Sequence, residues 1–202
     1  MITPQSHEEY VNEVFDGASL EGMELQGTRF MECRFRHAAL DEIKTSGCVF
    51  SNCDFTEARL NASVHNGSAF LNCQFRGTNL FAAKFEDCKL TGSVFTKVNF
   101  SGFMNQGGDW AFTSLRHNQM TGVQLTKARL LEADLYECNL EKATLREADL
   151  TGAVLDKAVL TGADLRGANL EGIDFTQVEL KGVRLDISQA ITIITSFGAL
   201  VE

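Results

Sequence analysis

The large hydrophobic residues of this chain recur every five positions. From Tyr10 to Leu185, positions divisible by five hold leucine, phenylalanine or another large apolar residue, and only Thr45, His65 and Asn105 interrupt the pattern. Neither the helical period of 3.6 nor the strand period of two produces a repeat of five, so the chain must turn once per unit. The pattern therefore predicts a coil of short sides in which every fifth residue points into the core.

Two further positions of the five-residue unit have a preferred residue type. A small side chain stands two residues before each large one, as in the alanine-rich run from Ala128 to Ala168. Glycine is frequent two residues after the large one, as at Gly17 and Gly22, and glycine suits a turn because it adopts backbone angles that other residues resist. We therefore expect the large and small residues to face the core and the other three to face solvent.

This unit resembles that of the pentapeptide-repeat family, whose alanine, aspartate or asparagine, leucine motif occurs at Ala133-Asp134-Leu135, Ala148-Asp149-Leu150 and Ala163-Asp164-Leu165. The resemblance implies an all-β solenoid, a right-handed quadrilateral β-helix with four units per coil and residues twenty apart stacked on each other. At about 4.8 Å per coil, the roughly nine coils would form a rod about 43 Å long. The expected divisions are a lead-in at residues 1–9, the solenoid at 10–185, and a helix with a tail at 186–202.

Irregular residues gather on one side of this expected coil. Folding the sequence at twenty residues places Thr45, His65 and Asn105 in a single column. Either this side is distorted to shape a contact, or its polar groups form hydrogen bonds inside the core, and we favour the second because buried polar groups usually find partners. Phe103 occupies a position for a small residue, so we expect a local bulge there and no domain boundary.

The position of the cysteines in the repeat argues against a metal site or a disulfide. All six occupy the small inward position that alanine fills elsewhere, so we expect them to pack as small hydrophobes. They are Cys33, Cys48, Cys53, Cys73, Cys88 and Cys138. The four histidines share no metal-binding or catalytic motif, and a flat-sided rod offers no deep cleft for a reaction. We expect neither an enzyme nor a bound metal or cofactor.

Charge and hydropathy limit the kind of partner. The formal net charge is −9, which disfavours direct nucleic-acid binding because phosphates would be repelled, and it permits a basic partner. The acidic excess is largest in residues 1–57. No secretory signal or membrane-spanning stretch is found in the sequence, so a cytoplasmic protein without a membrane contact is expected.

The repeat stops after Leu185, and the pattern then predicts a short amphipathic helix that caps the last coil. Asp186 or Ser188 can cap its start, and Gly198 suits the residue after its end. Its covering face is expected to hold Ile187, Ala190, Ile191, Ile194 and Phe197. Ile193, Ala199, Leu200 and Val201 exceed what one covering face needs. Exposed apolar residues at a rod tip suit a homodimer contact, which we favour over a cap alone. The candidate contact residues are Ile187, Ala190, Ile191, Ile193, Ile194, Phe197 and Leu200.

A narrower resemblance concerns function. Residues 67–75, the segment 92–95, and the tail with Asp186-Ile187-Ser188-Gln189-Ala190 and Phe197-Gly198 are similar to MfpA and the related Qnr-type quinolone-resistance proteins. The resemblance implies an end-to-end dimer that imitates duplex DNA, binds DNA gyrase or topoisomerase IV, and alters fluoroquinolone susceptibility. The unbroken repeat leaves no room for the projecting loops that many Qnr-type proteins carry.

Carboxylates on two adjoining sides are candidates for contacts with such a partner. An acidic rod would meet each enzyme lysine or arginine with a carboxylate in place of a phosphate. One side holds Glu32, Asp109, Glu132, Asp149 and Glu171, and the next holds Asp54, Glu57, Asp134, Glu137, Asp156 and Asp174. Basic residues share the second side, so a general protein-interaction scaffold or regulator that does not bind topoisomerases stays as the alternative.

Overall fold

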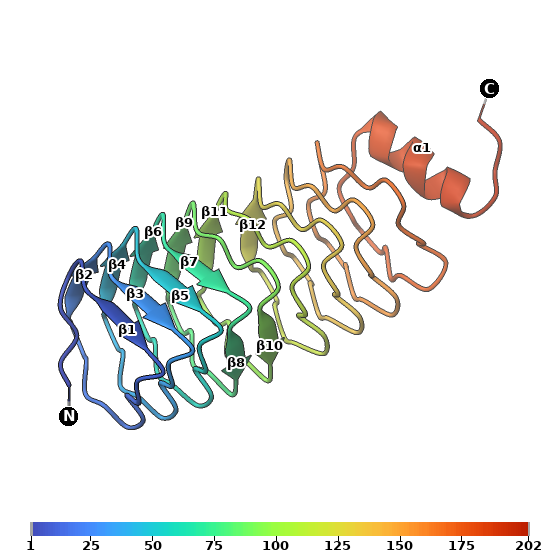
Figure 1. The fold of residues 1–202 in the computed structure, drawn as a ribbon. Coiled ribbons are helices and arrows are strands. Elements are labelled where there is room, and N and C mark those ends of the chain that lie inside the picture. The colour runs from blue at the N-terminus through green and yellow to red at the C-terminus, as the bar shows by residue number, and fades with distance from the viewer. Residues whose placement is uncertain (1, 202) are drawn as a thin grey trace.

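In the computed structural model, which describes residues 2–201, the chain winds into a β-solenoid whose coils stack from the N-terminus to the C-terminus (Figure 1). Each coil has four short sides, and the large and small residues of the repeat lie buried inside. The predicted solenoid and its inward positions are therefore confirmed. Among the described residues, no helix has both the length and the hydrophobicity needed to cross a bilayer.

The strands are three residues long and pair in parallel. One sheet contains β1 (Glu9–Val11), β3 (Arg29–Met31), β5 (Val49–Ser51) and β7 (Ala69–Leu71). A second contains β2 (Glu24–Gln26), β4 (Lys44–Ser46), β6 (Val64–Asn66), β9 (Lys84–Glu86), β11 (Met104–Gln106) and β12 (Gln124–Thr126). A third pairs β8 (Gln74–Arg76) with β10 (Val94–Thr96). Each sheet forms one side of the rod, so residues on a side are stacked coil upon coil.

The register of the stacked coils is twenty residues throughout the described solenoid. Glu9 pairs with Arg29 at one end, and an isolated bridge joins Asp164 to Arg184 at the other. Regular strands end at Thr126, and the later coils are joined by isolated bridges. The twenty-residue coil is thus confirmed, while only some of the nine predicted coils carry regular strands, at most six deep in one sheet.

The turns explain why glycine is frequent and why it is not required. Gly17 has a φ of 65°, but Glu32 and Lys157 adopt almost the same left-handed conformation at equivalent positions, with φ values of 55° and 57°. Gly108 differs, because it occupies a small inward position with a φ of 83°, and an added Cβ would lie 2.6 Å from the carbonyl oxygen of Cys88. A side chain at Gly108 would therefore require the neighbouring coil to move.

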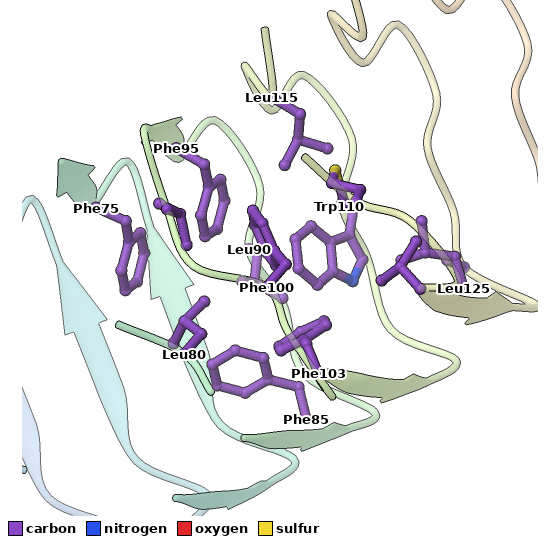
Figure 2. Packing of buried hydrophobic residues seen from close by; sticks show 14 of the residues in the cluster. Phe75, Leu80, Phe85, Leu90, Phe95, Phe100, Phe103, Trp110, Leu115 and Leu125 are labelled. Atoms are coloured by element: carbon purple, nitrogen blue, oxygen red, sulfur yellow. The ribbon is translucent and has the colours of Figure 1, made fainter. Parts of the chain in front are cut away.

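Aromatic rings form columns in the core. Phe15 stacks on Phe35 with ring centroids 4.9 Å apart, and Phe75 stacks on Phe95 at 4.7 Å with an interplanar angle of 1° (Figure 2). Each stacked pair adds about 0.5–1.5 kcal/mol beyond the burial of its surface. The aromatic column predicted from the twenty-residue period is confirmed.

Trp110 and Phe103 fill the core where the repeat is least regular (Figure 2). Trp110 is fully buried, and its ring centroid lies 5.5 Å from that of Phe95 and 5.9 Å from that of Phe103. Strand β11 in this segment still pairs with β9 and β12 at the usual register. The predicted bulge is therefore absent from the pairing, because Phe103 and the indole fill the core without shifting the strands.

The C-terminal end is covered by α1 (Ile187–Ser196), which begins after a capping box formed by Asp186 and Gln189 (Figure 1). The helix itself is confirmed, but its predicted covering face is wrong. The buried helix residues are Gln189 and Ile193, while Ile187 is 82% exposed. The helix turns this way because the Gln189 side-chain amide donates a hydrogen bond, 3.1 Å long, to the carbonyl oxygen of Ala168 in the solenoid.

Candidate protein-interaction surface

The polar residues inside the core bind one another. The Thr45 Oγ1 lies 2.7 Å from the His65 Nδ1 and 2.9 Å from the Ser68 Oγ, and the His65 Nε2 lies 3.0 Å from the Ser63 Oγ. The third irregular residue, Asn105, accepts a hydrogen bond from an indole N–H of the core. The expected internal hydrogen bonds are confirmed, and they account for the irregular side without an external ligand.

His65 should give the protein a measurable dependence of stability on pH. Burial lowers the pKa of His65 to about 3, whereas an unfolded histidine titrates near 6.5. Between these values only the unfolded chain binds the proton, so the contribution is fully present above about pH 6.5 and is lost as the pH falls toward 3. We expect the free energy of unfolding to fall by about 1.4 kcal/mol per pH unit from this residue in that window.

The measurement is urea denaturation of the wild type and of His65→Phe between pH 4 and 7. Phenylalanine already occupies the same column one coil later, at Phe85, so the variant should fold. Comparing the two proteins cancels the titration of carboxylates, and the His65→Phe curve should be flatter. Parallel curves would show that His65 does not titrate on unfolding.

The cysteines are packing residues. All six are free and buried, and the Cys33 Sγ lies 3.4 Å from the carbonyl oxygen of Tyr10 on the neighbouring coil. Burial raises the pKa of Cys138 to about 12, so its thiol stays protonated and is a poor metal ligand or nucleophile. The predicted packing role is confirmed. Within residues 2–201, no three or more histidine, cysteine or acidic residues are grouped so that they could hold a metal ion.

Five of the predicted partner-binding carboxylates are held by bases of the adjacent coil. The pairs are Asp54–Arg36 at 2.6 Å, Glu57–His37 at 3.1 Å, Asp109–Arg129 at 2.9 Å, Asp134–Arg116 at 2.9 Å and Glu137–Lys157 at 3.2 Å. Exposed ion pairs of this kind contribute little to stability. They do balance the carboxylate charges, apart from that of Glu57 when His37 is neutral, so these five acids are weak candidates for recognition by a basic partner.

The other predicted carboxylates form no ion pair with any residue that the structure describes. Glu32 lies toward the N-terminal end, and the rest lie in the C-terminal coils, where we call them the C-terminal acidic surface: Glu132, Asp149, Asp156, Glu171 and Asp174. Hydrogen bonds from the backbone N–H and the hydroxyl of Thr176 lower the pKa of Asp174, which keeps that carboxylate ionised. The structure thus brings about half of the predicted acids together as an unbalanced group.

At the C-terminal end of the rod, α1 and the residues that follow it expose large apolar side chains. We call them the α1 apolar face: Ile187, Ile191, Ile194, Phe197 and Leu200, which are 40–93% exposed. Ala190 is half-buried. Ile193 must be withdrawn as a contact residue, since it is 6% exposed and packs beneath the helix. Ile187, Ile191, Ile194 and Phe197 thus form an exposed surface, although the helical periodicity predicted that they cover the last coil.

Two exposed aromatic residues escaped the sequence analysis. Phe81 and Phe112 are each 52% exposed, on different sides of the rod. The sequence does contain a signal for both: each is a large apolar residue at an outward position of the repeat, where polar or small residues are usual. Neither lies in the C-terminal acidic surface.

The chain was compared with protein families and solved structures. The family model described as pentapeptide repeats matches residues 33–63, 67–102, 119–156, 133–172 and 153–186. A trypsin-treated variant of QnrB1, described as a plasmid-mediated fluoroquinolone resistance protein, is similar with a TM-score of 0.86 and 21% identity, covering 98% of this chain and 100% of that one. Full-length QnrB1 gives a TM-score of 0.62 and 20% identity, covering 95% and 98%. No curated protein sequence matches the chain.

Proposed function

Because this chain belongs to the pentapeptide-repeat family, we propose that it is a protein ligand of a type II topoisomerase, either DNA gyrase or topoisomerase IV. In this proposal it imitates duplex DNA, occupies the basic DNA-binding groove of the enzyme and alters its response to fluoroquinolones. The likeness to QnrB1 supports the shape of such a ligand, a rigid rod of stacked coils. Recognition must then come from the surface charges of this chain.

The C-terminal acidic surface is the observation that carries the proposal. Its five carboxylates lie on two adjoining sides of the last coils, and none forms an ion pair with a described lysine or arginine. The bases nearest to them in the register, Arg129 and Lys157, are paired with Asp109 and Glu137 instead. A DNA-binding groove presents lysine and arginine to phosphates, so an unbalanced row of carboxylates offers the same kind of partner. The rigidity of the solenoid holds these charges in place before binding, which limits the entropy lost on association.

Dimerisation would extend this acidic row. A second copy seated on the α1 apolar face would bury the exposed isoleucine, phenylalanine and leucine side chains of both protomers. A twofold axis there places two C-terminal acidic surfaces next to each other at the centre of a longer rod. The proposed ligand is therefore a homodimer in which the two C-terminal acidic surfaces meet near the middle.

Light scattering of helix variants tests the dimer. Phe197→Asp and Ile194→Asp each place a carboxylate in the proposed contact, where burial of the charge would be unfavourable, so each should shift the protein from dimer to monomer. Phe81→Asp is the matched control, since Phe81 is equally exposed but lies far from α1, and it should stay dimeric. A wild type that is monomeric, or a Phe197→Asp variant that stays dimeric, would count against this contact.

One observation favours the second candidate function, a general interaction scaffold that does not bind topoisomerases. Toward the N-terminal end, acids and bases alternate between coils, as in the pairs Arg34–Asp16 and Lys44–Glu24, both 2.7 Å long. Such a surface is a patchwork of charges and is unlike a phosphate backbone. Under the topoisomerase proposal, this half of the rod contributes length, stiffness and an acidic charge that its ion pairs partly offset.

Supercoiling by purified gyrase separates the two candidates. Added protein should inhibit supercoiling of relaxed plasmid at micromolar concentration, or restore supercoiling in the presence of a fluoroquinolone. Serum albumin, an unrelated acidic protein that should not bind the plasmid, controls for non-specific effects at equal concentration. If the protein neither inhibits nor protects gyrase or topoisomerase IV, the topoisomerase proposal is wrong and the scaffold function is favoured.

A further inference from the structure

The two ends of the solenoid are closed to different extents. At the C-terminal end, α1 and the residue before it form hydrogen bonds with the last coils, including one from the Gly167 N–H to the Asp186 Oδ2 at 2.9 Å. At the N-terminal end, Pro4 is buried over the core, and the His7 N–H donates to the carbonyl oxygen of Gln26 at 2.8 Å. These residues cover the side formed by β2, while the side that contains Ser19 keeps an open edge.

The open edge consists of Ser19, Leu20 and Glu21, and we call it the Ser19 edge. In the next coil, the carbonyl oxygens of Ala39 and Asp41 accept hydrogen bonds from the first coil, both 2.8 Å long, and the Ala39 N–H donates one of equal length. The equivalent groups of the first coil are the Ser19 N–H and the carbonyl oxygens of Ser19 and Glu21. None of the three has a hydrogen-bond partner in the part of the chain that the structure describes. A complete set of strand-pairing groups is therefore left open.

An acidic hollow lies beside the Ser19 edge. It has a volume of about 440 Å³ and is lined by Glu21, Gly22, Asp41 and Glu42. Arg59 contacts two of these carboxylates, Glu21 at 2.8 Å and Asp41 at 3.0 Å. Glu42 forms no ion pair with a described residue, so the hollow keeps negative charge next to the open backbone groups.

The charge of the first coil selects the occupant of this edge. No lysine or arginine precedes Arg29, whereas the first coil carries Glu8, Glu9, Glu13, Asp16, Glu21 and Glu24. Two such ends facing each other would repel, which disfavours pairing of this edge with the same edge of a second copy. A cationic partner would be attracted, and an extended segment could use the open hydrogen-bonding groups.

We infer that the N-terminal end is a docking site for an extended, lysine- or arginine-containing segment of a partner protein. The segment adds as a strand to the Ser19 edge and places a cationic side chain in the hollow beside Glu42. Its backbone supplies the two donors and the acceptor that a preceding coil supplies to the later coils. This site lies at the opposite end of the rod from α1, so it does not depend on the topoisomerase proposal.

Peptide binding tests the site. The probes are a fluorescein-labelled peptide that alternates lysine and valine, and a second peptide with glutamate in place of each lysine. In fluorescence anisotropy, the lysine peptide should bind and the glutamate peptide should bind more weakly by at least about tenfold. Amide exchange followed by NMR should slow at Ser19 when the lysine peptide is added.

Two variants separate strand pairing from charge attraction. Ser19→Pro removes an N–H that has no partner in the described solenoid, and proline is tolerated at such positions on edge strands. This variant should therefore fold, and it should bind the lysine peptide about tenfold more weakly. Glu42→Lys should weaken it by a similar factor, and it should fold because Lys97 adopts the same turn conformation. Phe197→Asp should leave peptide binding unchanged. Equal binding of both peptides, unchanged affinity in Ser19→Pro and Glu42→Lys, or protection at the C-terminal acidic surface instead of Ser19 would overturn the inference.

Discussion

Trp110→Ala is expected to lower the free energy of unfolding by about 3–5 kcal/mol, the usual cost of removing a large buried aromatic residue. Trp110 is fully buried, so its loss leaves a cavity between the rings of Phe95 and Phe103. The substitution also removes the indole N–H that donates to the Asn105 Oδ1 at 3.0 Å, which leaves a buried acceptor without its partner. Trp110 is the only tryptophan of the chain, so the variant has no tryptophan fluorescence to report unfolding. Urea denaturation should therefore be followed by circular dichroism.

A paired substitution distinguishes the cavity from the lost hydrogen bond. In Trp110→Leu combined with Asn105→Leu, both positions hold the residue found in the next coil, at Leu130 and Leu125. This double variant should recover part of the stability lost in Trp110→Leu alone, because no buried polar group is then left unpaired. A loss below about 1 kcal/mol in Trp110→Ala would contradict the tight packing around the indole.

The second large effect is expected on partner binding. Reversing three unpaired charges of the C-terminal acidic surface, with Glu132→Lys, Asp149→Lys and Glu171→Lys, should weaken gyrase binding by about a hundredfold or more, because like charges that face each other across an interface cost several kcal/mol. Glu132 and Glu171 are exposed, whereas Asp149 is half-buried and accepts a hydrogen bond, 3.1 Å long, from the Thr151 N–H, so circular dichroism must show that the triple variant is folded before its affinity is compared. Affinity is measured by biolayer interferometry with immobilised gyrase at low and physiological salt.

A charge-matched control shows whether position or net charge matters. Glu86→Lys, Glu141→Lys and Glu179→Lys change the net charge by the same amount on other sides of the rod. This variant should bind gyrase with nearly wild-type affinity at physiological salt, where distant charges are screened. If both triple variants lose affinity equally, binding follows net charge and the C-terminal acidic surface has no special role.

The sequence predicts the interior of this protein well, because a solenoid repeats one local rule. Each large residue at a multiple of five meets another one coil later, so burial, aromatic stacking and the packing of Cys33 or Cys138 follow from position alone. The partners of His65 were harder to predict. They include Ser63 directly and Ser68 through Thr45. Both serines occupy small positions of the repeat, where the five-residue pattern does not distinguish a hydroxyl from alanine.

The helix face could not be predicted from periodicity. A stripe of isoleucines indicates an amphipathic helix, but the open end of the last coil presents carbonyl oxygens as well as apolar surface. Gln189 satisfies one of these carbonyl oxygens, and Ile193 follows it one turn later on the same side. That contact turns Ile187 and Ile194 outward.

The pairing of surface charges was also beyond a column analysis. The columns place residues twenty apart in contact. Arg36 and Arg116 instead bind Asp54 and Asp134 on the neighbouring coil, each eighteen residues away in the sequence. Long side chains choose between straight and diagonal partners by their rotamers. The acids that form no ion pair, such as Glu132 and Glu171, can be identified only when the side-chain positions of all neighbouring lysines and arginines are known.

Competition between this protein and duplex DNA for gyrase is the most direct test of the proposed DNA imitation. Labelled duplex is bound to gyrase at a fixed concentration, and the unlabelled protein is titrated against it while fluorescence anisotropy is recorded. The account predicts full displacement, with the apparent Kd for DNA rising in proportion to the protein concentration. Gyrase that holds the protein and the duplex together, with an unchanged Kd for DNA, would contradict it.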